Sequence, residues 1–443
     1  MPFKIKRLIY ACLSESGGVL DYAVYQVGAL LKDASKRDGN AFELHFICHK
    51  SFPVERLPAG IILHRFQAKR HHSEKRGFLS KVYRVFSIVA DLRSEAKQVA
   101  QLAEELAKDS STRDSLPVTS RNLGAAEVSV LFDCYKEYFA PFWIWPLQRL
   151  AKKGVVMGTI AHDPVRDFVV GPLWWHRWSV RLGYSFVRHV FVHDDTPVDF
   201  GGKRPEGIAV HQIPFGAYPL SPPRGGREEV RNRFGFANSD IVFFAFGQIR
   251  DGKNLDLFLR AMTKLPENVK LLVAGKGHSG SSKPPEFYQD LAEELGVAER
   301  CRFEIRRIPD EEVGELFNAI DFTLLTYSAK FRSMSAVLAT ALTARKPVLA
   351  SSGPGPLKSV VEKYHLGEFV NPDDAEEILR GAQMILDSLP PLALDARRST
   401  LDSAKPLATS TLLNPEWARY ERENSWEGNV FRILSALNYA AKR

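Results

Sequence analysis

The chain has 443 residues, of which 45% are hydrophobic and 25% charged, and its formal net charge is +8. This length and composition predict a globular protein with two sizeable cores. The four cysteines are scattered without metal-ligand spacing, which argues against a disulfide scaffold and leads us to expect reduced thiols in a cytoplasmic protein. No apolar run approaches the ~20 residues that span a bilayer. The surplus of cations fits an anionic partner: nucleic acid, anionic lipid or a phosphorylated metabolite.

Apolar strands and helical segments alternate through the first half of the chain. The first strand is expected at residues 5–14; it leads into Gly17-Gly18 and is too short for a signal peptide. Further strands are expected at 42–50, 60–66, 128–135, 155–163, 189–195 and 208–219, with helices at 19–34, 81–108 and 146–154. Such alternation predicts a parallel sheet covered on both faces.

A proline-rich break at residues 219–226 indicates a domain linker, after which the alternation starts again. Strands are expected at 241–247, 269–275, 301–307, 322–327 and 346–351, and helices at 255–262, 287–296, 311–320, 335–344 and 375–386. The sequence therefore predicts an α/β protein of two doubly wound, Rossmann-like domains. Open α/β sheets bind their ligands at the carboxyl ends of the strands.

The stretch from residue 243 to 262 carries the clearest chemical signal. An apolar run ends at Gly247, and Arg250 and Lys253 follow before a helix begins. A strand that ends in a glycine turn beside two cations suits a polyanion, although a surface loop with solvated cations has the same pattern. Ser335 can cap a second helix, with Ala336 and Val337 offering N–H groups to an anion. Two such sites in one domain suit a diphosphate.

Five motifs then occur in a characteristic order. They are G-x-I-R-x-x-K at 247–253, V-A-G-K at 273–276, I-P-D-E-E at 308–312, S-A-V-L-x-x-A-L-x-x-x-K-P-V-L-A-S at 335–351, and L-G-E-F-V at 366–370. This order resembles the C-terminal domain of family 4 glycosyltransferases (glycosyl transferases group 1) of the GT-B fold. Gly17-Gly18, residues 159–164 and residues 210–218 resemble N-domain segments of the same enzymes. The resemblance implies two domains that face each other across a cleft.

The resemblance also implies the roles of the domains. Residues 1–218, with a C-terminal helix at 415–443 returning to them, would bind the acceptor, and residues 219–414 would bind the nucleotide-sugar donor. The implied activity is that of a hexosyltransferase that takes a sugar from a nucleotide diphosphate sugar. That donor is a co-substrate, and no cofactor or metal is expected.

The implied catalytic residues are Arg250, Lys253 and His162. The cations and the helix after Ser335 would stabilise the diphosphate leaving group. The implied donor-binding residues are Gly247, Gln248, Gly275, Ile308, Ser335, Ala336, Val337 and Thr340, and Gly17, Gly18 and Asp163 would lie on the acceptor side. His162 would orient the sugar or hold a proton. We expect a retaining reaction, and Asp163 is the alternative base if the reaction inverts.

The chain departs from the family pattern at the donor site. Typical members carry two glutamates spaced E-x7-E, and the matching positions here hold Arg332 and Thr340. The arginine that usually follows the glycine is replaced by Gln248. We therefore expect a subgroup without the E-x7-E glutamates. A catalytically inactive GT-B relic that binds sugar or nucleotide is the alternative, and the presence of both Arg250 and Lys253 favours the enzyme.

Aromatic and basic residues are mixed at 139–146 and 171–189, and cations gather at 65–84. These segments predict core packing and solvated surface, or a membrane-facing patch that grips a lipid-linked saccharide. Nucleic-acid binding fits a cleft architecture less well. We expect a cytoplasmic enzyme of surface polysaccharide or glycan synthesis, peripheral at the inner face of the membrane.

Overall fold

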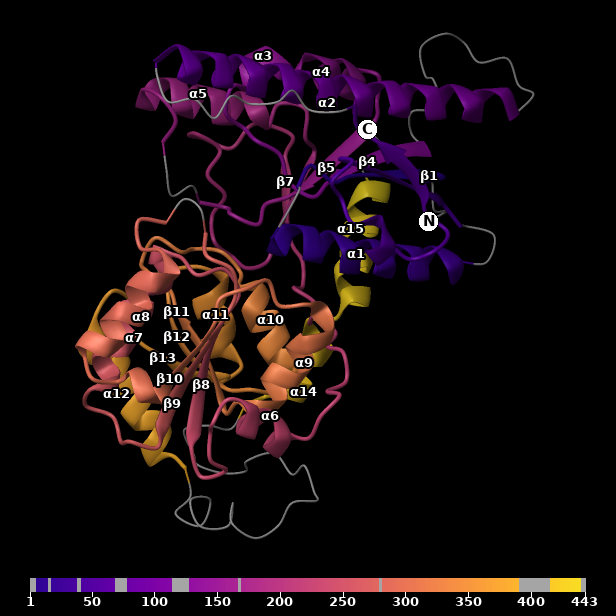
Figure 1. Ribbon diagram of the computed structural model, residues 1–443. Coiled ribbons are helices and arrows are strands. Elements are labelled where there is room, and N and C mark those ends of the chain that lie inside the picture. The colour runs from indigo at the N-terminus through magenta and orange to yellow at the C-terminus, as the bar shows by residue number, and fades with distance from the viewer. Residues whose placement is uncertain are drawn as a thin grey trace. The chain divides into compact units, whose positions relative to one another are not determined.

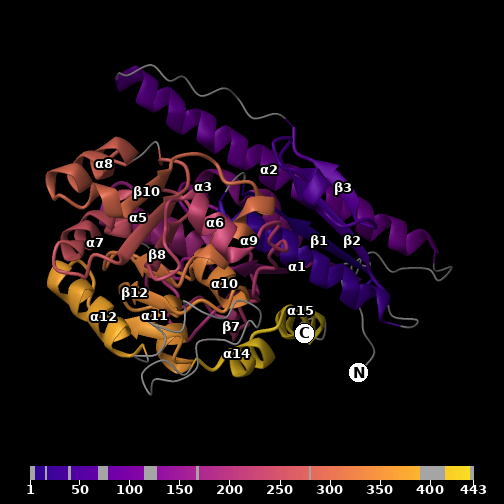
Figure 2. The same cartoon turned by 60° about the horizontal axis from the view of Figure 1, so that its bottom comes forward.

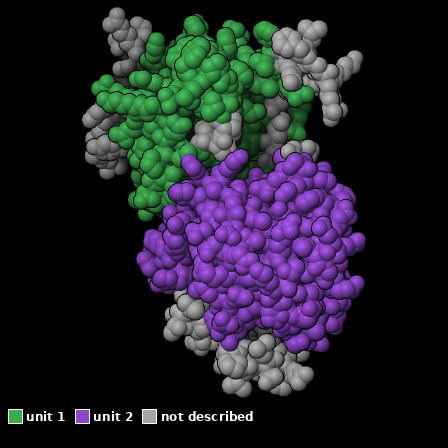
Figure 3. All heavy atoms as spheres, turned by 90° about the vertical axis from the view of Figure 1, so that its left-hand side faces the viewer, with its two compact units in different colours: residues 1–214, 426–443 green, residues 215–425 purple. Residues whose placement is uncertain are grey.

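The computed structural model describes residues 5–14, 17–37, 41–67, 78–113, 127–165, 169–278, 281–389 and 415–439. The basic segment at 65–84 lies partly outside these residues. The chain forms two compact units, residues 1–214 with 426–443 and residues 215–425 (Figure 3). Each unit holds one sheet, of seven and six strands, and the described strands pair in parallel. The expected fold class, two Rossmann-like α/β domains, is confirmed.

Unit 1 has the strand order β3-β2-β1-β4-β5-β6-β7. The strands are β1 (Arg7–Ala11), β2 (Glu43–Cys48), β3 (Ile62–Arg65), β4 (Val128–Phe132), β5 (Val156–Ile160), β6 (His189–Val192) and β7 (Ala209–Gln212). The helices are α1 (Gly18–Ser35), α2 (Phe78–Arg113), α3 (Ala140–Trp143), α4 (Trp145–Lys152), α5 (Leu173–Gly183) and α15 (Trp426–Tyr439), with a 3-10 turn, η1 (Val54–Arg56). The central strands β1, β4 and β5 are buried along their whole length because helices cover both faces.

Helix α15 packs on the same side of unit 1 as α1 (Figures 1 and 2). A Cβ on Gly158 of β5 would lie 3.3 Å from the Leu437 side chain, so this glycine lets α15 approach the sheet. A buried amide network then joins the two helices. Asn429 accepts from Gln26 Nε2 at 2.8 Å and donates to the Tyr22 hydroxyl at 2.7 Å. The last helix of the chain is thereby fixed in the N-terminal unit.

Unit 2 has the strand order β10-β9-β8-β11-β12-β13. The strands are β8 (Ile241–Phe246), β9 (Val269–Ala274), β10 (Cys301–Glu304), β11 (Phe322–Thr326), β12 (Val348–Ser351) and β13 (Gly367–Phe369). The helices are α6 (Arg227–Arg233), α7 (Leu255–Met262), α8 (Pro285–Glu294), α9 (Asp310–Ala319), α10 (Ala336–Thr343), α11 (Pro356–Lys363), α12 (Ala375–Asp387) and α14 (Trp417–Glu423), with 3-10 turns η3 (Asp251–Lys253) and η4 (Ala298–Arg300). One core joins α7, α8 and α12 to the sheet, and a second joins α6, α9, α10, α11 and α14 (Figure 1).

The boundary of unit 2 differs from the expected division at residues 218 and 415. Tyr218 O accepts from Thr343 Oγ1 of α10 at 2.6 Å, and Phe215 O accepts from the Tyr420 hydroxyl of α14 at 2.6 Å. The segment from residue 215 and helix α14 therefore belong to unit 2, and the chain returns to unit 1 only from Trp426.

Each sheet has one point where the strand order reverses. In unit 1 it lies between β1 and β4, and in unit 2 between β8 and β11. Loops leave such a pair of strands in opposite directions, so a crevice opens at the carboxyl ends. Among the described residues, no helix combines the length and apolar character needed to cross a bilayer.

Candidate active site

Two glycines shape the carboxyl end of β8 in unit 2. Gly247 has φ +84°, a conformation that L side chains rarely adopt. A Cβ on Gly275, at the end of β9, would lie 2.0 Å from Gly247 O. The two turns can pack this closely only because Gly275 lacks a side chain. Gly275 therefore supports the turn that Gly247 makes.

Lys253 folds back over this glycine turn. Its Nζ donates a hydrogen bond to Phe246 O and lies 3.6 Å from the position that a Cβ on Gly247 would take. Burial, with a further contribution from the positive charge of Arg250, lowers the pKa of Lys253 to about 7. The surroundings of the ammonium thus supply little negative charge. An anion bound at this point would stabilise the charged form of Lys253.

The first turn of α10 lies next to the same glycine. Val337 Cγ2 is 3.6 Å from the Cβ position on Gly247, on a par with Lys253. Ser335 caps the helix by accepting from Leu338 N at 3.3 Å, and its hydroxyl lies 3.0 Å from that of Tyr327. The structure therefore brings Gly247, Lys253 and the start of α10 together, with the positive end of a helix dipole at the turn.

The loop that follows β11 holds this arrangement in place. Thr326 Oγ1 donates to Lys253 O at 3.0 Å. Tyr327 stacks on Phe331 with ring centroids 4.2 Å apart, and the Arg250 guanidinium lies 6.0 Å from the Phe331 ring centroid. A pocket at this point is lined by Ala245, Gly247, Ile249, Arg250, Lys253, Leu255, Val273, Leu324, Thr326 and Tyr327. Two cations line this pocket, and the first turn of α10 lies beside Gly247, an arrangement that can bind an anionic group.

Tyr327 and Phe331 were not among the predicted residues. Tyr327 is the last residue of the expected strand at 322–327, which is a signal for a position at the sheet edge, but its contact with Ser335 depends on how the loop folds.

The other predicted donor residues lie in different surroundings. Gln248 is exposed at the turn, and Ala336 is partly buried at the start of α10. Ile308 is 8% exposed and packs in a hydrophobic core. The Thr340 hydroxyl donates to Ala336 O within its own helix at 3.1 Å. The structure does not bring Ile308 or the Thr340 hydroxyl to the lysine.

The glycine turn at Gly353 and Gly355, which looked suited to a ligand, is packed against protein. A Cβ on Gly353 would lie 2.2 Å from Ala329 O, and one on Gly355 would lie 2.6 Å from Arg332 O. These glycines therefore allow a close approach between two loops. Arg332 itself is exposed.

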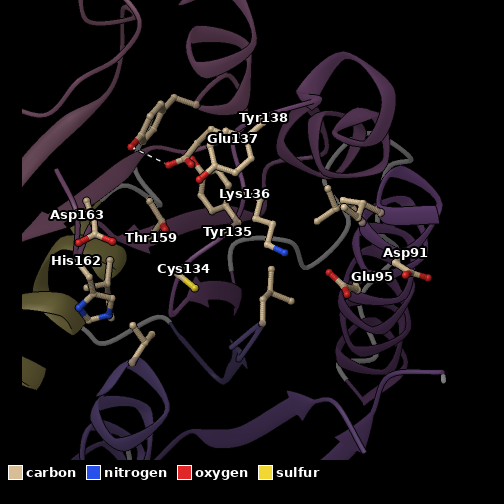
Figure 4. Close-up of a pocket in the computed structure, with 17 residues that line it drawn as sticks. Asp91, Glu95, Cys134, Tyr135, Lys136, Glu137, Tyr138, Thr159, His162 and Asp163 are labelled. Carbon is tan, nitrogen blue, oxygen red and sulfur yellow. Dashed lines mark hydrogen bonds between the residues drawn. The ribbon is translucent and has the colours of Figure 1, made fainter. Parts of the chain in front are cut away.

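Unit 1 has a cavity of about 230 Å³ at its own switch point (Figure 4). Its wall includes Leu13 after β1, Cys134 after β4 and His162 and Asp163 after β5. Four carboxylates contribute to the lining: Asp91, Glu95, Glu137 and Asp163. Of the predicted acceptor-side residues, His162 and Asp163 lie here, whereas Gly17 and Gly18 start α1 one step away from the lining residue Val19.

His162 is held among aromatic rings. Its ring meets Tyr22 edge-on with centroids 4.7 Å apart, and its Nδ1 lies 3.4 Å from His193 Nε2. Burial lowers the pKa of His162 to about 4, so the imidazole is neutral at physiological pH. A neutral imidazole can orient a hydroxyl by hydrogen bonding, and Asp163 beside it is exposed.

Asp133 is a residue of this edge that sequence reasoning missed. Its carboxylate accepts hydrogen bonds from Leu13 N at 2.9 Å, from Cys134 N at 2.6 Å and from the Cys12 thiol at 3.2 Å. It is fully buried, and burial raises its pKa. Asp133 therefore fixes the loop after β1 that leads toward the cavity. An aspartate directly after a strand of apolar residues was the available signal.

Part of the C-terminal unit is similar to a known family. Residues 226–397 match the family model described as glycosyl transferases group 1. Curated relatives include D-inositol 3-phosphate glycosyltransferase of Mycobacterium ulcerans, 35% identical over 134 residues, or 29% of this chain and 27% of the relative. The enzyme of the same name from Thermomonospora curvata is 31% identical over 225 residues, or 49% of this chain and 47% of the relative. The chain thus spans less than half of these relatives.

A solved structure extends the likeness to both units. Anabaena HepE in complex with UDP and glucose superposes with a TM-score of 0.64 and 15% sequence identity, covering 98% of this chain and 100% of that one. At this identity the likeness concerns the fold. The fold is that of the GT-B glycosyltransferases, and residues 226–397 are similar to the glycosyl transferases group 1 family.

Proposed function

We propose that the protein is a glycosyltransferase that moves a sugar from a nucleotide diphosphate sugar to a saccharide or lipid-linked saccharide. The observation that carries the proposal is the meeting of Lys253, Arg250 and the first turn of α10 at the glycine turn after β8. The family match of residues 226–397 and the UDP bound to HepE support a nucleotide-sugar donor.

The chemistry follows from the charges at this turn. When the bond between the sugar and the diphosphate breaks, negative charge develops on the leaving diphosphate oxygen. Lys253 and Arg250 would stabilise this charge more strongly in the transition state than in the bound donor, and only such a difference accelerates the reaction. The two cations would supply the positive charge that a metal ion provides in other transferases.

The acceptor would lie in unit 1, in the cavity beside His162 and Asp163. A neutral His162 would orient an acceptor hydroxyl, and the carboxylates of the lining would accept hydrogen bonds from sugar hydroxyls. We propose a retaining reaction, in a subgroup that lacks the E-x7-E glutamates and acts in surface polysaccharide or glycan synthesis on the cytoplasmic side of a membrane.

Nucleoside diphosphates test the proposal directly. UDP, GDP and ADP are added to the protein, and thermal unfolding is followed. A ligand at 100 times its Kd stabilises the folded state by about 2.7 kcal/mol, so at least one of the three should raise Tm measurably. Release of that nucleotide from the corresponding sugar donor then separates an enzyme from a relic. If none of the three raises Tm, the diphosphate assignment is refuted; if one binds and its sugar donors are never turned over, the relic is favoured.

A further inference from the structure

Tryptophan is concentrated in one short part of the sequence. The chain has seven tryptophans, and five lie between residues 143 and 178. They belong to α3, α4 and α5, which stand together beside the long helix α2 (Figure 1). Two of them are strongly exposed, Trp174 at 68% and Trp145 at 61%. Trp143 is buried in the core of unit 1, but burial does not explain the presence of Trp145 and Trp174.

The exposed rings form a connected surface. Trp175 lies between its neighbours, with ring centroids 5.3 Å from Trp178 and 5.9 Å from Phe142 of α3. Phe142 is 51% exposed and Trp178 46%. We call Phe142, Trp145, Leu173, Trp174 and Trp178 the aromatic surface. A contiguous apolar surface of this kind on a folded protein usually meets a partner or a membrane.

Cations lie directly beside the aromatic surface. A groove of about 580 Å³ between α2, α3 and α4 is lined by Arg93, Lys97 and Arg149, with Phe142 and Trp145 at its wall. Glu104 also lines it, and this carboxylate accepts from Lys153 Nζ at 2.7 Å. On α5, Arg177 and Arg181 are exposed between and beyond the tryptophans. The surface therefore presents apolar rings with a surplus of positive charge beside them.

We propose that α2, α3, α4 and α5 form a docking surface for an anionic lipid bilayer. The rings of the aromatic surface enter the interfacial layer, where the amphipathic indole is most stable. Arg93, Lys97 and Arg149 bind lipid phosphates in the groove. Anionic lipid fits better than a protein partner because the cations flank the rings, and basic side chains beside interfacial aromatics match headgroups in charge and depth. The surface involves no donor-site residue, so it stands independently of the proposed activity.

Vesicle binding tests the contribution of the rings. The full chain is mixed with vesicles of phosphatidylglycerol and phosphatidylcholine, or of phosphatidylcholine alone, and binding is measured by flotation and by the blue shift of tryptophan emission. The wild type should bind the anionic vesicles more tightly. The double variant Trp174→Ala with Trp178→Ala should lose on the order of 100-fold in partitioning. Phe431→Ala, which removes an exposed ring (63%) on α15, should bind as the wild type does.

A second pair of variants tests the charges. The triple variant Arg93→Gln, Lys97→Gln and Arg149→Gln should weaken anionic-vesicle binding about 100-fold and reduce its salt dependence. The control replaces three exposed cations of unit 2, Arg260, Lys358 and Arg422, by glutamine.

Equal binding by the test and control variants, or no preference for anionic vesicles, overturns the proposal. Self-association that the tryptophan substitutions abolish, without any vesicle binding, would assign the surface to a second copy and overturn it as well. Circular dichroism of every variant identifies any that fails to fold.

Discussion

Removing the charge of Lys253 is the sharpest test of the proposed donor site. Lys253→Met keeps an unbranched side chain of similar length and deletes the ammonium that lies over Gly247. A hydrogen bond between charged groups contributes about 1.5–3 kcal/mol, and 1.4 kcal/mol is a factor of ten in Kd. We therefore expect the variant to bind the preferred nucleoside diphosphate roughly 10- to 150-fold more weakly at neutral pH.

The pH dependence of binding makes this test specific. Burial and the charge of Arg250 hold the pKa of the free Lys253 at about 7, and a diphosphate beside it must raise that pKa. Between the two pKa values, binding takes up a proton. The ionisation of Lys253 should therefore leave the wild-type affinity unchanged below about pH 7. Above that pH the affinity should fall by up to tenfold per pH unit. The second pKa of a phosphate ester lies near 6, so its ionisation is largely complete at pH 7 and the slope above pH 7 belongs to the protein.

Isothermal titration calorimetry measures both quantities. Binding of the nucleoside diphosphate is followed from about pH 6 to about pH 9 in two buffers of different ionisation enthalpy, which reveals proton uptake. Lys264→Met, at an exposed lysine that pairs with Glu376, is the matched control and should keep the wild-type slope. Proton uptake that persists in Lys253→Met, or wild-type affinity that does not change between pH 7 and 9, would refute the assignment of Lys253 to the diphosphate.

Three further substitutions test the supports of the two sites. Gly275→Ala places a Cβ 2.0 Å from a carbonyl oxygen, whereas the Cβ of the control Gly296→Ala meets nothing within 4 Å. Gly275→Ala should therefore lower the free energy of unfolding by about 1–3 kcal/mol more than the control does. Equal midpoints of urea unfolding would contradict this. Asn429→Ala leaves buried hydrogen-bonding groups without a partner and should lower the free energy of unfolding, measured in urea, by at least ~2 kcal/mol. Phe431→Ala on the same helix should lower it by less than ~0.5 kcal/mol. His162→Gln should keep kcat/KM within about tenfold of the wild type, because an amide can replace a neutral imidazole that only orients a hydroxyl. The pKa of His162 is about 4, so a fall of wild-type kcat/KM below about pH 6.5 would argue against this role.

The alternation of strands and helices could be predicted because each strand and each long helix produces its own local pattern of apolar residues. Strand β8, for example, consists only of apolar residues, so it appears in the sequence as an uninterrupted apolar segment that ends in a turn. The same reasoning located Arg250 and Lys253, since residues after a strand must lie at the carboxyl edge of the sheet. The helices α6 and α11 were not expected, because each is one or two turns long and follows glycine or proline.

Side-chain direction and loop packing could not be predicted in the same way. Thr340 lies in the expected helix, yet its hydroxyl bonds to that helix, and this depends on a rotamer. Gly353 resembles a ligand-binding glycine but opposes Ala329 O, which is more than twenty residues away in the chain. The contact of Tyr327 with Ser335 likewise requires the fold of the intervening loop. Contacts between segments that are distant in the chain produce no periodic pattern of residues, so the sequence does not predict them.

The lowered pKa of Lys253 also bears on whether unit 2 is an active donor site or a relic. In the unfolded chain this lysine has its ordinary pKa of 10.5, whereas in the folded unit its pKa is about 7. Between these values the unfolded state binds more protons, so Lys253 reduces stability progressively as the pH falls from 10.5 to 7, and the reduction then stays constant. At neutral pH the folded unit thus carries an unfavourable charge that an apolar side chain would avoid. A bound diphosphate would offset this electrostatic cost by pairing with the ammonium. Groups with strongly perturbed pKa values are common at binding sites for this reason. The free energy lost by burying the ammonium therefore favours a site that binds an anion.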